Sequence, residues 1–217
     1  MVGGKTASSI GRQPRAPRKA DDEKFPEKFF SYRKLSNLRY KGKMPAALFI
    51  GRFQPLHKGH LFALRHIAAK SSRIYVVIGS AQEKRTEKNP FSARERMSMM
   101  KAVLVKEKLA NMCRVFLLQD IPNDYEWVSY LDAHVPKYDV CYSNNALVLK
   151  LMRRSGKKIA RVPLFARKKY NATSVRERMR KGKEWESRVP TGVREKIGKT
   201  DVPEAVKKIV HEKIGKK

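Results

Sequence analysis

The chain has 217 residues, and 50 Lys and Arg residues against 20 Asp and Glu residues give it a formal net charge of +30. This length predicts one domain, or one domain with appendages, and a hydrophobic fraction of 41 % is sufficient for a packed core. The sequence holds no run of about 18 apolar residues, so no membrane-spanning helix is expected. The excess of positive charge favours a polyanionic partner, which could be a nucleotide, a nucleic acid or an anionic surface.

Residues 1–45 are predicted to form a basic, largely disordered extension, and residues 46–217 are predicted to form one domain that ends in helices. The stretch up to Ala20 is rich in Gly, Ser, Pro and basic residues and has no acidic residue. Because it lacks acids, this stretch also resembles a mitochondrial transit peptide, although Pro14 and Pro17 interrupt any long amphipathic helix. The apolar residues at positions 25–35 are expected to pack on the domain, with stacking on a partner as the alternative.

The two cysteines, Cys113 and Cys141, both lie inside apolar runs. They are too few for a disulfide framework and lack the spacing of a zinc site. A reducing compartment is therefore expected, which makes the cytoplasm the predicted location and a mitochondrial location the alternative.

From residue 46 onward, short apolar runs alternate with segments of helical periodicity. A helix is predicted after Ser92, which forms a capping box with Glu95, and Gly182 is placed to end a later helix. The predicted strands cover residues 46–50, 74–78, 115–118, 138–142 and 159–162, and the other predicted helices cover residues 58–69, 127–134, 146–153, 173–180 and 202–213.

Apolar strands joined by crossover helices predict an α/β fold, in which a doubly wound, mostly parallel sheet has helices on both faces. In a sheet of this kind, ligands bind beyond the carboxyl ends of the strands, at the point where the strand order reverses. The functional site is therefore expected just after the strand ends, which are Ile50, Ile78, Leu118, Tyr142 and Val162.

The loop after the first predicted strand concentrates groups that suit a polyphosphate. It leads into the N-terminus of a helix, where anions commonly bind. Gly51 permits a tight turn, Gly59 allows His57 and His60 to converge, and Arg52 adds a positive charge. The chain has neither a G-x-x-x-x-G-K-[ST] loop nor a G-x-G-x-x-G fingerprint, so a P-loop and a classical dinucleotide site are both excluded.

The H-x-G-H string in this loop resembles the signature of the nucleotidyltransferase superfamily, which has a Rossmann-like fold. The longer string at residues 51–60, G-R-F-Q-P-x-H-x-G-H, is similar to archaeal-type nicotinamide-nucleotide adenylyltransferases. Later segments agree with the same family in order and spacing, from about residue 48 to residue 190: Gly79-Ser80-Ala81-Gln82, Asn89-Pro90-Phe91-Ser92-Ala93-x-Glu95-Arg96, Asp120-Ile121, Trp127-Val128, Tyr142-Ser143-Asn144-Asn145, Pro163-Leu164-Phe165 and Thr173-x-Val175-Arg176, with Trp185 and Pro190 beyond.

The resemblance implies adenylyl transfer from ATP to nicotinamide mononucleotide, giving NAD and pyrophosphate. The phosphate of the mononucleotide is expected to attack the α-phosphorus directly and in line. This phosphate is largely dianionic near neutral pH, because its second pKa is about 6. Catalysis is then expected to come from positioning and charge stabilisation, with Mg²⁺ held mainly by the ATP phosphates rather than by a protein metal site.

The resemblance also assigns roles to residues at strand and helix ends. The residues expected to be catalytic are His57, His60, Arg52 and Arg176, which contact the ATP phosphates. ATP is further expected to contact Gly51, Phe53, Gly59 and Thr173. Ser143 and Asn144 are weaker candidates for the adenosine side.

The mononucleotide is expected to bind Gly79, Ser80, Asp120 and Trp127, with the indole of Trp127 stacked on the nicotinamide ring. Core packing is the alternative role for Trp127, and capping a turn or helix is the alternative for Asp120. The chain departs from the family pattern at four positions without losing a phosphate-binding group: Arg85 replaces a His, Asp124 an Asn, Ala146 a Pro and Ala172 a Gly.

Two other functions compete with this one. The first is a different adenylyl- or cytidylyltransferase of the same fold, which Trp127 and the G-R-F-Q-P string argue against. The second is a nucleotidyltransferase fold used as a basic RNA-binding or ribonucleoprotein component, with Lys and Arg on phosphates and little sequence selectivity. A homo-oligomer is expected from the family, and RNA or another polyanion is an additional possible partner of the basic surface.

Overall fold

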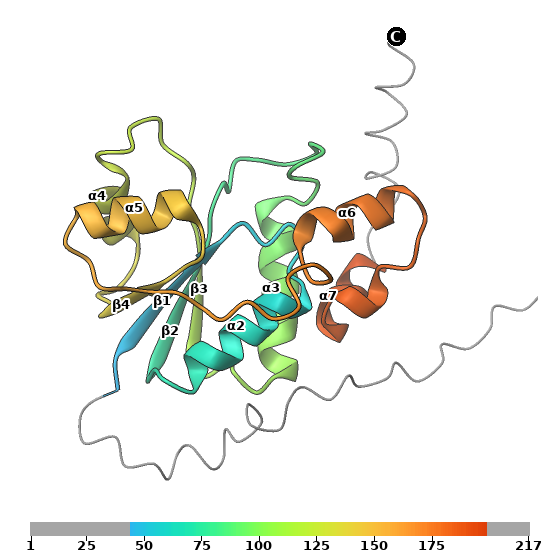
Figure 1. Cartoon of the computed structure of the whole chain (residues 1–217), viewed down its shortest axis with the longest axis horizontal. Coiled ribbons are helices and arrows are strands. Elements are labelled where there is room, and N and C mark those ends of the chain that lie inside the picture. Colours follow the sequence, from blue (N-terminus) through green and yellow to red (C-terminus); the bar gives the residue numbers. More distant parts are fainter. Residues whose placement is uncertain (1–43, 199–217) are drawn as a thin grey trace, which may run out of the picture.

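Five short apolar runs pair side by side as a parallel sheet in the computed structural model, which describes residues 44–198 (Figure 1). The strand order is β3-β2-β1-β4-β5. The predicted doubly wound parallel fold is therefore confirmed. The strands are β1 (Ala46–Gly51), β2 (Arg73–Ile78), β3 (Cys113–Leu117), β4 (Val140–Tyr142) and β5 (Ile159–Ala160).

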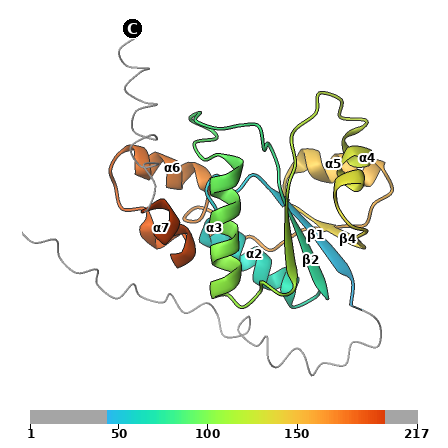
Figure 2. The ribbon, with the colours of Figure 1, turned by 180° about the vertical axis from the view of Figure 1, so that it is seen from behind.

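Side chains of the central strands alternate between two cores, as a sheet covered on both faces requires. Phe49 and Val76 join one cluster of buried residues, whereas Leu48 and Val77 join the other. Helices α2 (Lys58–Ala68) and α3 (Ala93–Lys106) contribute to the first cluster, and α4 (Trp127–His134) and α5 (Ala146–Arg154) contribute to the second. Figures 1 and 2 show these two helix pairs on opposite sides of the sheet.

The strand order reverses at β1, which pairs with β2 on one side and with β4 on the other. The loops that leave β1 and β4 must therefore run toward opposite faces, and this opens a crevice between them at the carboxyl edge of the sheet. The segment from β5 crosses this region to α6 (Ala172–Arg180), which lies beyond α2 (Figure 1).

Most of the predicted elements are confirmed with small shifts of their ends. Ser92 caps α3 by accepting a hydrogen bond from the backbone N–H of Glu95 at 3.3 Å. Gly182 follows α6 with φ +61°, the left-handed conformation expected after a helix end. Strand β3 begins two residues earlier than predicted because Cys113 pairs with Ile74, and β4 and β5 are shorter than predicted because only three and two of their residues join the ladder.

The 3-10 turn η2 (Glu186–Arg188) and the helix α7 (Thr191–Ile197) were not predicted from the sequence. Helix α7 packs closely on α3, because a Cβ atom at Gly192 would lie 2.9 Å from the carbonyl carbon of Ala102. The predicted helix at 202–213 and nearly all of the predicted N-terminal extension lie outside the described residues. Within residues 44–198, no helix is long and apolar enough to cross a membrane.

Candidate functional site

The loop between β1 and α2 folds tightly over an aromatic ring. A Cβ atom at Gly51 would lie 2.9 Å from the ring of Phe53, which explains why glycine stands there. Phe53 itself has φ 50° and is only 2 % exposed. Its ring also meets that of His60 edge to face, with 4.9 Å between the centroids. Phe53 was predicted to bind ATP, and its buried ring leaves only its backbone available for such a contact.

The two histidines of the loop converge as predicted. The rings of His57 and His60 are stacked with centroids 3.7 Å apart, and the backbone N–H of His57 donates to Nδ1 of His60 at 3.3 Å. A Cβ atom at Gly59 would lie 3.0 Å from the His57 ring and 3.1 Å from the carbonyl oxygen of Tyr170, so the glycine makes this convergence possible. Among the described residues, Nδ1 of His57 is buried and has no hydrogen-bond partner.

Both imidazoles are neutral near pH 7. Burial lowers the pKa of His57 to about 4, and the positive charge of Arg176 acts in the same direction. Burial also holds the pKa of His60 well below its usual range, with His57 adding to the effect. Since Nδ1 of His60 accepts a hydrogen bond, its proton lies on Nε2. An anionic ligand at this point would raise both pKa values and strengthen both imidazoles as donors.

Three guanidinium groups gather around the same loop. Arg176 donates to the carbonyl oxygen of Gln54 at 2.8 Å and to the hydroxyl of Thr173 at 3.3 Å, which brings two predicted phosphate-binding residues together. The charge of the exposed Arg52 lowers the pKa of Arg176 and of Arg96, second to burial in each case. In the described part of the chain, none of these three arginines forms an ion pair, and the two that are not fully buried, Arg52 and Arg176, remain available for an anion.

Arg96 is the member of this group that sequence reasoning named only as part of a motif. It is completely buried and donates to four carbonyl oxygens: those of Arg52 at 2.9 Å, Gly79 at 2.7 Å, Ser80 at 2.9 Å and Ser92 at 3.4 Å. One side chain therefore fixes the turns after β1 and β2 relative to each other. The sequence did contain a signal, because Arg96 shares the buried face of α3 with Met99 and Met100, where a cation is unusual.

The turn after β2 brings together three of the residues predicted to bind the mononucleotide. The backbone of Ser80 has φ 49°, and its N–H donates to the carboxylate of Asp120 at 3.2 Å. Asp120 thus caps the turn, as its alternative role predicted, and it sits beside Gly79 and Ser80. Trp127 begins α4, and its half-buried indole packs against the second core cluster, which matches its alternative role. Contacts of these four residues with a mononucleotide stay predictions.

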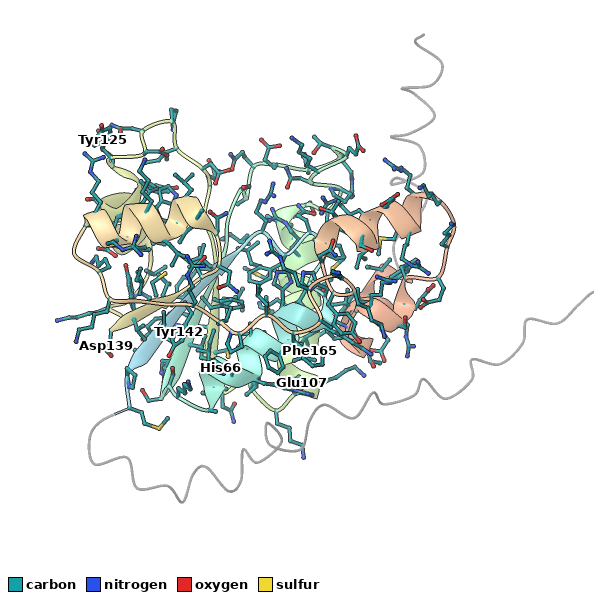
Figure 3. All side chains as sticks on the ribbon, viewed as in Figure 1. His66, Glu107, Tyr125, Asp139, Tyr142 and Phe165 are labelled. Carbon is teal, nitrogen blue, oxygen red and sulfur yellow. The ribbon has the colours of Figure 1, made fainter. Side chains whose placement is uncertain are left out.

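A cavity of about 270 Å³ opens at the reversal point of the strand order. Four of the predicted ATP-binding residues line it, as do Ser143 and Asn144. The site was expected beyond Val162, and Pro163, Leu164 and Phe165 were named as part of a motif, but no site role was predicted for the wall of this cavity formed by residues 162–171. Phe165 lies beside α2 (Figure 3), stacked between Phe62 and Tyr170 with centroid distances of 4.9 and 5.8 Å. The predicted residues in the lining are Gly51, His57, Gly59 and His60, and those for which no site role was predicted from the sequence include Val162, Pro163, Leu164, Phe165, Arg167, Tyr170 and Asn171.

The charged loop at residues 83–88 is tied down at two points. Arg85, which replaces the family's histidine, donates to both carboxylate oxygens of Glu95 at 2.8 and 3.0 Å and to the carbonyl oxygen of Pro90 at 2.9 Å. Glu87 accepts a hydrogen bond from Arg180 of α6 at 2.8 Å. Residues 83–88 are therefore linked to α3 through Glu95 and to α6 through Arg180.

Residues 48–178 match the family model described as cytidylyltransferase-like. The chain is 40 % identical over 137 residues to a nicotinamide-nucleotide adenylyltransferase of Pyrococcus furiosus, which covers 62 % of this chain and 73 % of that relative. It is 39 % identical over 136 residues to the enzyme of the same name from Thermoplasma acidophilum, covering 63 % of this chain and 75 % of that one.

The fold is similar to that of a solved bifunctional NMN adenylyltransferase/ADP ribose pyrophosphatase from Francisella tularensis, with a TM-score of 0.65 at 20 % sequence identity. The match covers 78 % of this chain but only 54 % of the other, so the chain spans about half of that bifunctional protein. A second structure of that protein, solved with AMP and a manganese ion, has a TM-score of 0.62 and also 20 % identity. These likenesses concern the fold alone.

The depressed pKa of His57 predicts a loss of stability in acid. The pKa is about 4 in the folded protein and about 6.5 in the unfolded chain, so only the unfolded chain takes up this proton between those values. Stability is therefore complete above pH 6.5 and falls as the pH decreases toward 4. At pH 5 this one group should cost about 2 kcal/mol, and His57→Gln should remove that part of the loss.

Urea unfolding at pH 7 and pH 5 measures this difference. The exposed His134→Gln is the control and should lose as much stability in acid as the wild type does. A His57→Gln protein that loses just as much would show that His57 is not responsible.

The four carbonyls held by Arg96 predict a second effect on stability. Arg96→Met leaves buried acceptors without donors and should lower the free energy of unfolding by roughly 3 kcal/mol or more. Arg96→Lys, which keeps the charge but lacks the fork of donors, should lose less. Lys106→Met, which removes an exposed ion pair to Glu195, should cost less than about 1 kcal/mol. Chemical denaturation compares the four proteins, and an Arg96→Met protein as stable as Lys106→Met would contradict the assignment.

Proposed function

Because the chain belongs to the cytidylyltransferase-like family, and within it to the nicotinamide-nucleotide adenylyltransferases, we propose that it joins ATP and nicotinamide mononucleotide to give NAD and pyrophosphate. One observation carries this proposal beyond family membership. Two stacked, neutral imidazoles line a cavity at the strand-order reversal. Arg52 belongs to the same loop and Arg176 donates a hydrogen bond to it, and neither arginine forms an ion pair among the described residues. That combination suits the triphosphate of a nucleotide.

The cavity is the proposed site of the adenosine part of ATP. It is lined by aromatic and apolar side chains on one wall and by the Ser143–Asn145 turn on the other. The triphosphate would then extend past His57 and His60 toward Arg52 and Arg176. Thr173, in the first turn of α6, lies where its hydroxyl and the helix N-terminus can receive the outer phosphates. The mononucleotide is assigned to the neighbouring turn formed by Gly79, Ser80 and Asp120, with Trp127 beyond.

The proposed reaction needs no side-chain nucleophile. A phosphate oxygen of the mononucleotide forms a bond to the α-phosphorus of ATP, and the bond from that phosphorus to the bridging oxygen breaks, releasing pyrophosphate. His57 and His60 donate N–H groups to the phosphate oxygens during this step. Arg52 and Arg176 neutralise the charge that grows on the leaving group, and Arg96 keeps the two substrate turns in register.

The donor set of the site suits Mg²⁺ that arrives with ATP. Its side chains are imidazoles and guanidiniums, and the one carboxylate at the neighbouring turn, Asp120, already accepts a backbone hydrogen bond. Among residues 44–198 no group of three His, Cys, Asp or Glu side chains is arranged to hold a metal ion. When bound, Mg²⁺ would be held by phosphate oxygens and would neutralise part of their charge.

Several wider features belong to the same proposal. Residues 1–45 are proposed to be an extension of a single enzyme domain, the assembly a homo-oligomer and the location the cytoplasm. The alternative function, a retained fold that serves as a basic RNA-binding component, is favoured by the net charge of +30. The convergence of His57, His60 and Arg176 speaks against replacement of the enzyme, because phosphate contacts on RNA require no such pocket. A polyanionic partner is therefore proposed as an addition to the activity.

Incubation of the purified chain with ATP, Mg²⁺ and nicotinamide mononucleotide tests the proposed reaction, with NAD and pyrophosphate measured by chromatography. His60→Ala should lower turnover by about a hundredfold or more, as the loss of a single transition-state donor does in other enzymes. His66→Ala, on the same helix but outside the cavity lining, is the matched control and should keep full turnover.

Two outcomes would overturn parts of this proposal. No NAD above background at micromolar enzyme, with product formed instead from CTP or another acceptor, would assign a different nucleotidyl transfer. A mild loss in His60→Ala would show that His60 is structural.

A further inference from the structure

More than half of the net charge of the described domain comes from one stretch. Residues 140–176 contain ten Lys and Arg residues and no Asp or Glu, whereas residues 44–198 as a whole have 32 basic and 13 acidic residues. Of this stretch, Arg167 and Arg176 lie at the nucleotide site. Most of its basic residues therefore lie outside that site. A stretch of this length without acidic residues makes the local electrostatic potential strongly positive. It attracts a polyanion more strongly than the binding of one ATP requires.

Two more cations of the stretch are occupied within the fold. Lys157 forms an ion pair with Asp132, and the guanidinium of Arg154 lies over the ring of Tyr125 at 3.9 Å. The remaining exposed cations around α5 and β5 form no ion pair in the described part of the chain. We call them the α5–β5 patch, which consists of Lys150, Arg153, Lys158 and Arg161.

The fold places these four side chains on two neighbouring elements at one edge of the sheet. Helix α5 turns Leu149, Leu151 and Met152 inward, so Lys150 and Arg153 lie on its exposed face. Strand β5 is the edge of the sheet, and Lys158 and Arg161 flank it. This side lies at the opposite end of the molecule from α6 and α7 (Figure 1), and Tyr125 marks its outer tip in Figure 3.

We propose that the α5–β5 patch binds the phosphate backbone of an RNA strand, at a surface separate from the nucleotide site. None of its four residues lines the cavity, so ATP does not occupy them. An anionic membrane fits less well, because Leu149, Leu151 and Met152 of α5 face the core and Leu147 is its one large apolar side chain that is exposed, which is too little for an inserting apolar face. The exposed Tyr125, 72 % exposed beneath Arg154, offers a flat aromatic group beside the patch on which an unpaired base can stack.

Counterion release sets the expected salt dependence. Four phosphate contacts on a single strand give a log–log slope of about −3, so affinity should fall roughly fiftyfold between 50 mM and 200 mM salt. Contacts of this kind position the strand without reading its sequence. The affinity should therefore vary little between RNA sequences of equal length.

A pair of charge-matched triple variants tests the location. The patch variant carries Lys150→Glu, Arg153→Glu and Arg161→Glu. The control variant carries Lys70→Glu, Arg73→Glu and Lys101→Glu, three exposed cations near the other face of the sheet, and so has the same net charge. Binding of a fluorescent 20-nucleotide single-stranded RNA is followed by anisotropy across a salt series. NAD formation by each full-length protein reports whether it is folded, and circular dichroism does so independently of activity.

The patch variant should bind RNA at least tenfold more weakly than the control variant, with a salt slope reduced by about 2, while both keep the wild-type rate of NAD formation. Equal losses in the two variants would show that net charge alone binds RNA and would overturn the patch. Displacement of the RNA by stoichiometric ATP would show that the RNA binds at the nucleotide site and not at the patch. Binding of phosphatidylserine vesicles without binding of RNA would assign the patch to a membrane surface. None of these results bears on the proposed adenylyl transfer, which is tested separately by NAD formation.

Discussion

The rest of the structure depends on a buried positive charge at the end of β1 that has no carboxylate partner. Arg96 is buried against four backbone carbonyls, and the same side chain joins the turns after β1 and β2. Carbonyl dipoles stabilise a buried cation less completely than an ion pair does, so the charge of Arg96 still acts on its surroundings. Together with Arg52 and Arg176, it makes this edge of the sheet a place where an anion gains energy on binding. Burial at the same point keeps His57 and His60 neutral until such an anion arrives.

Much of this arrangement was predictable from local sequence. The β-branched run at Ile74–Ile78 and the apolar run before Gly51 have the length and composition of buried parallel strands. The capping box at Ser92 and the glycine at 182 act through contacts within one turn, which is why their predictions hold. Gly59 between two histidines predicted their convergence for a similarly local reason, since the contact spans only three residues.

Long-range contacts account for what the sequence did not show. The cavity wall at residues 162–171 has no periodicity, and it takes shape only when Phe165 stacks on Phe62 of α2. Helix α7 is short and contains Gly192, which disfavours a helix in isolation; packing on α3 compensates for that preference. Asp120 illustrates a different limit. Its carboxylate accepts a hydrogen bond from the turn at Ser80, and the sequence alone does not distinguish this capping role from ligand binding.

Residues 44–198 carry +19 of the net charge of +30, and only part of it lies at the nucleotide site. At the nucleotide site, charge is concentrated, partly buried and coupled to the histidines. The most direct measurement of the account is an NMR titration of the histidine rings in the purified protein, with and without saturating Mg²⁺–ATP and without the mononucleotide. The pKa of His57, about 4 in the free protein, should rise by about one or more when the phosphates bind. A titration of His57 that is unchanged by ATP would show that the triphosphate does not lie against the histidine pair, and the proposed site would be wrong.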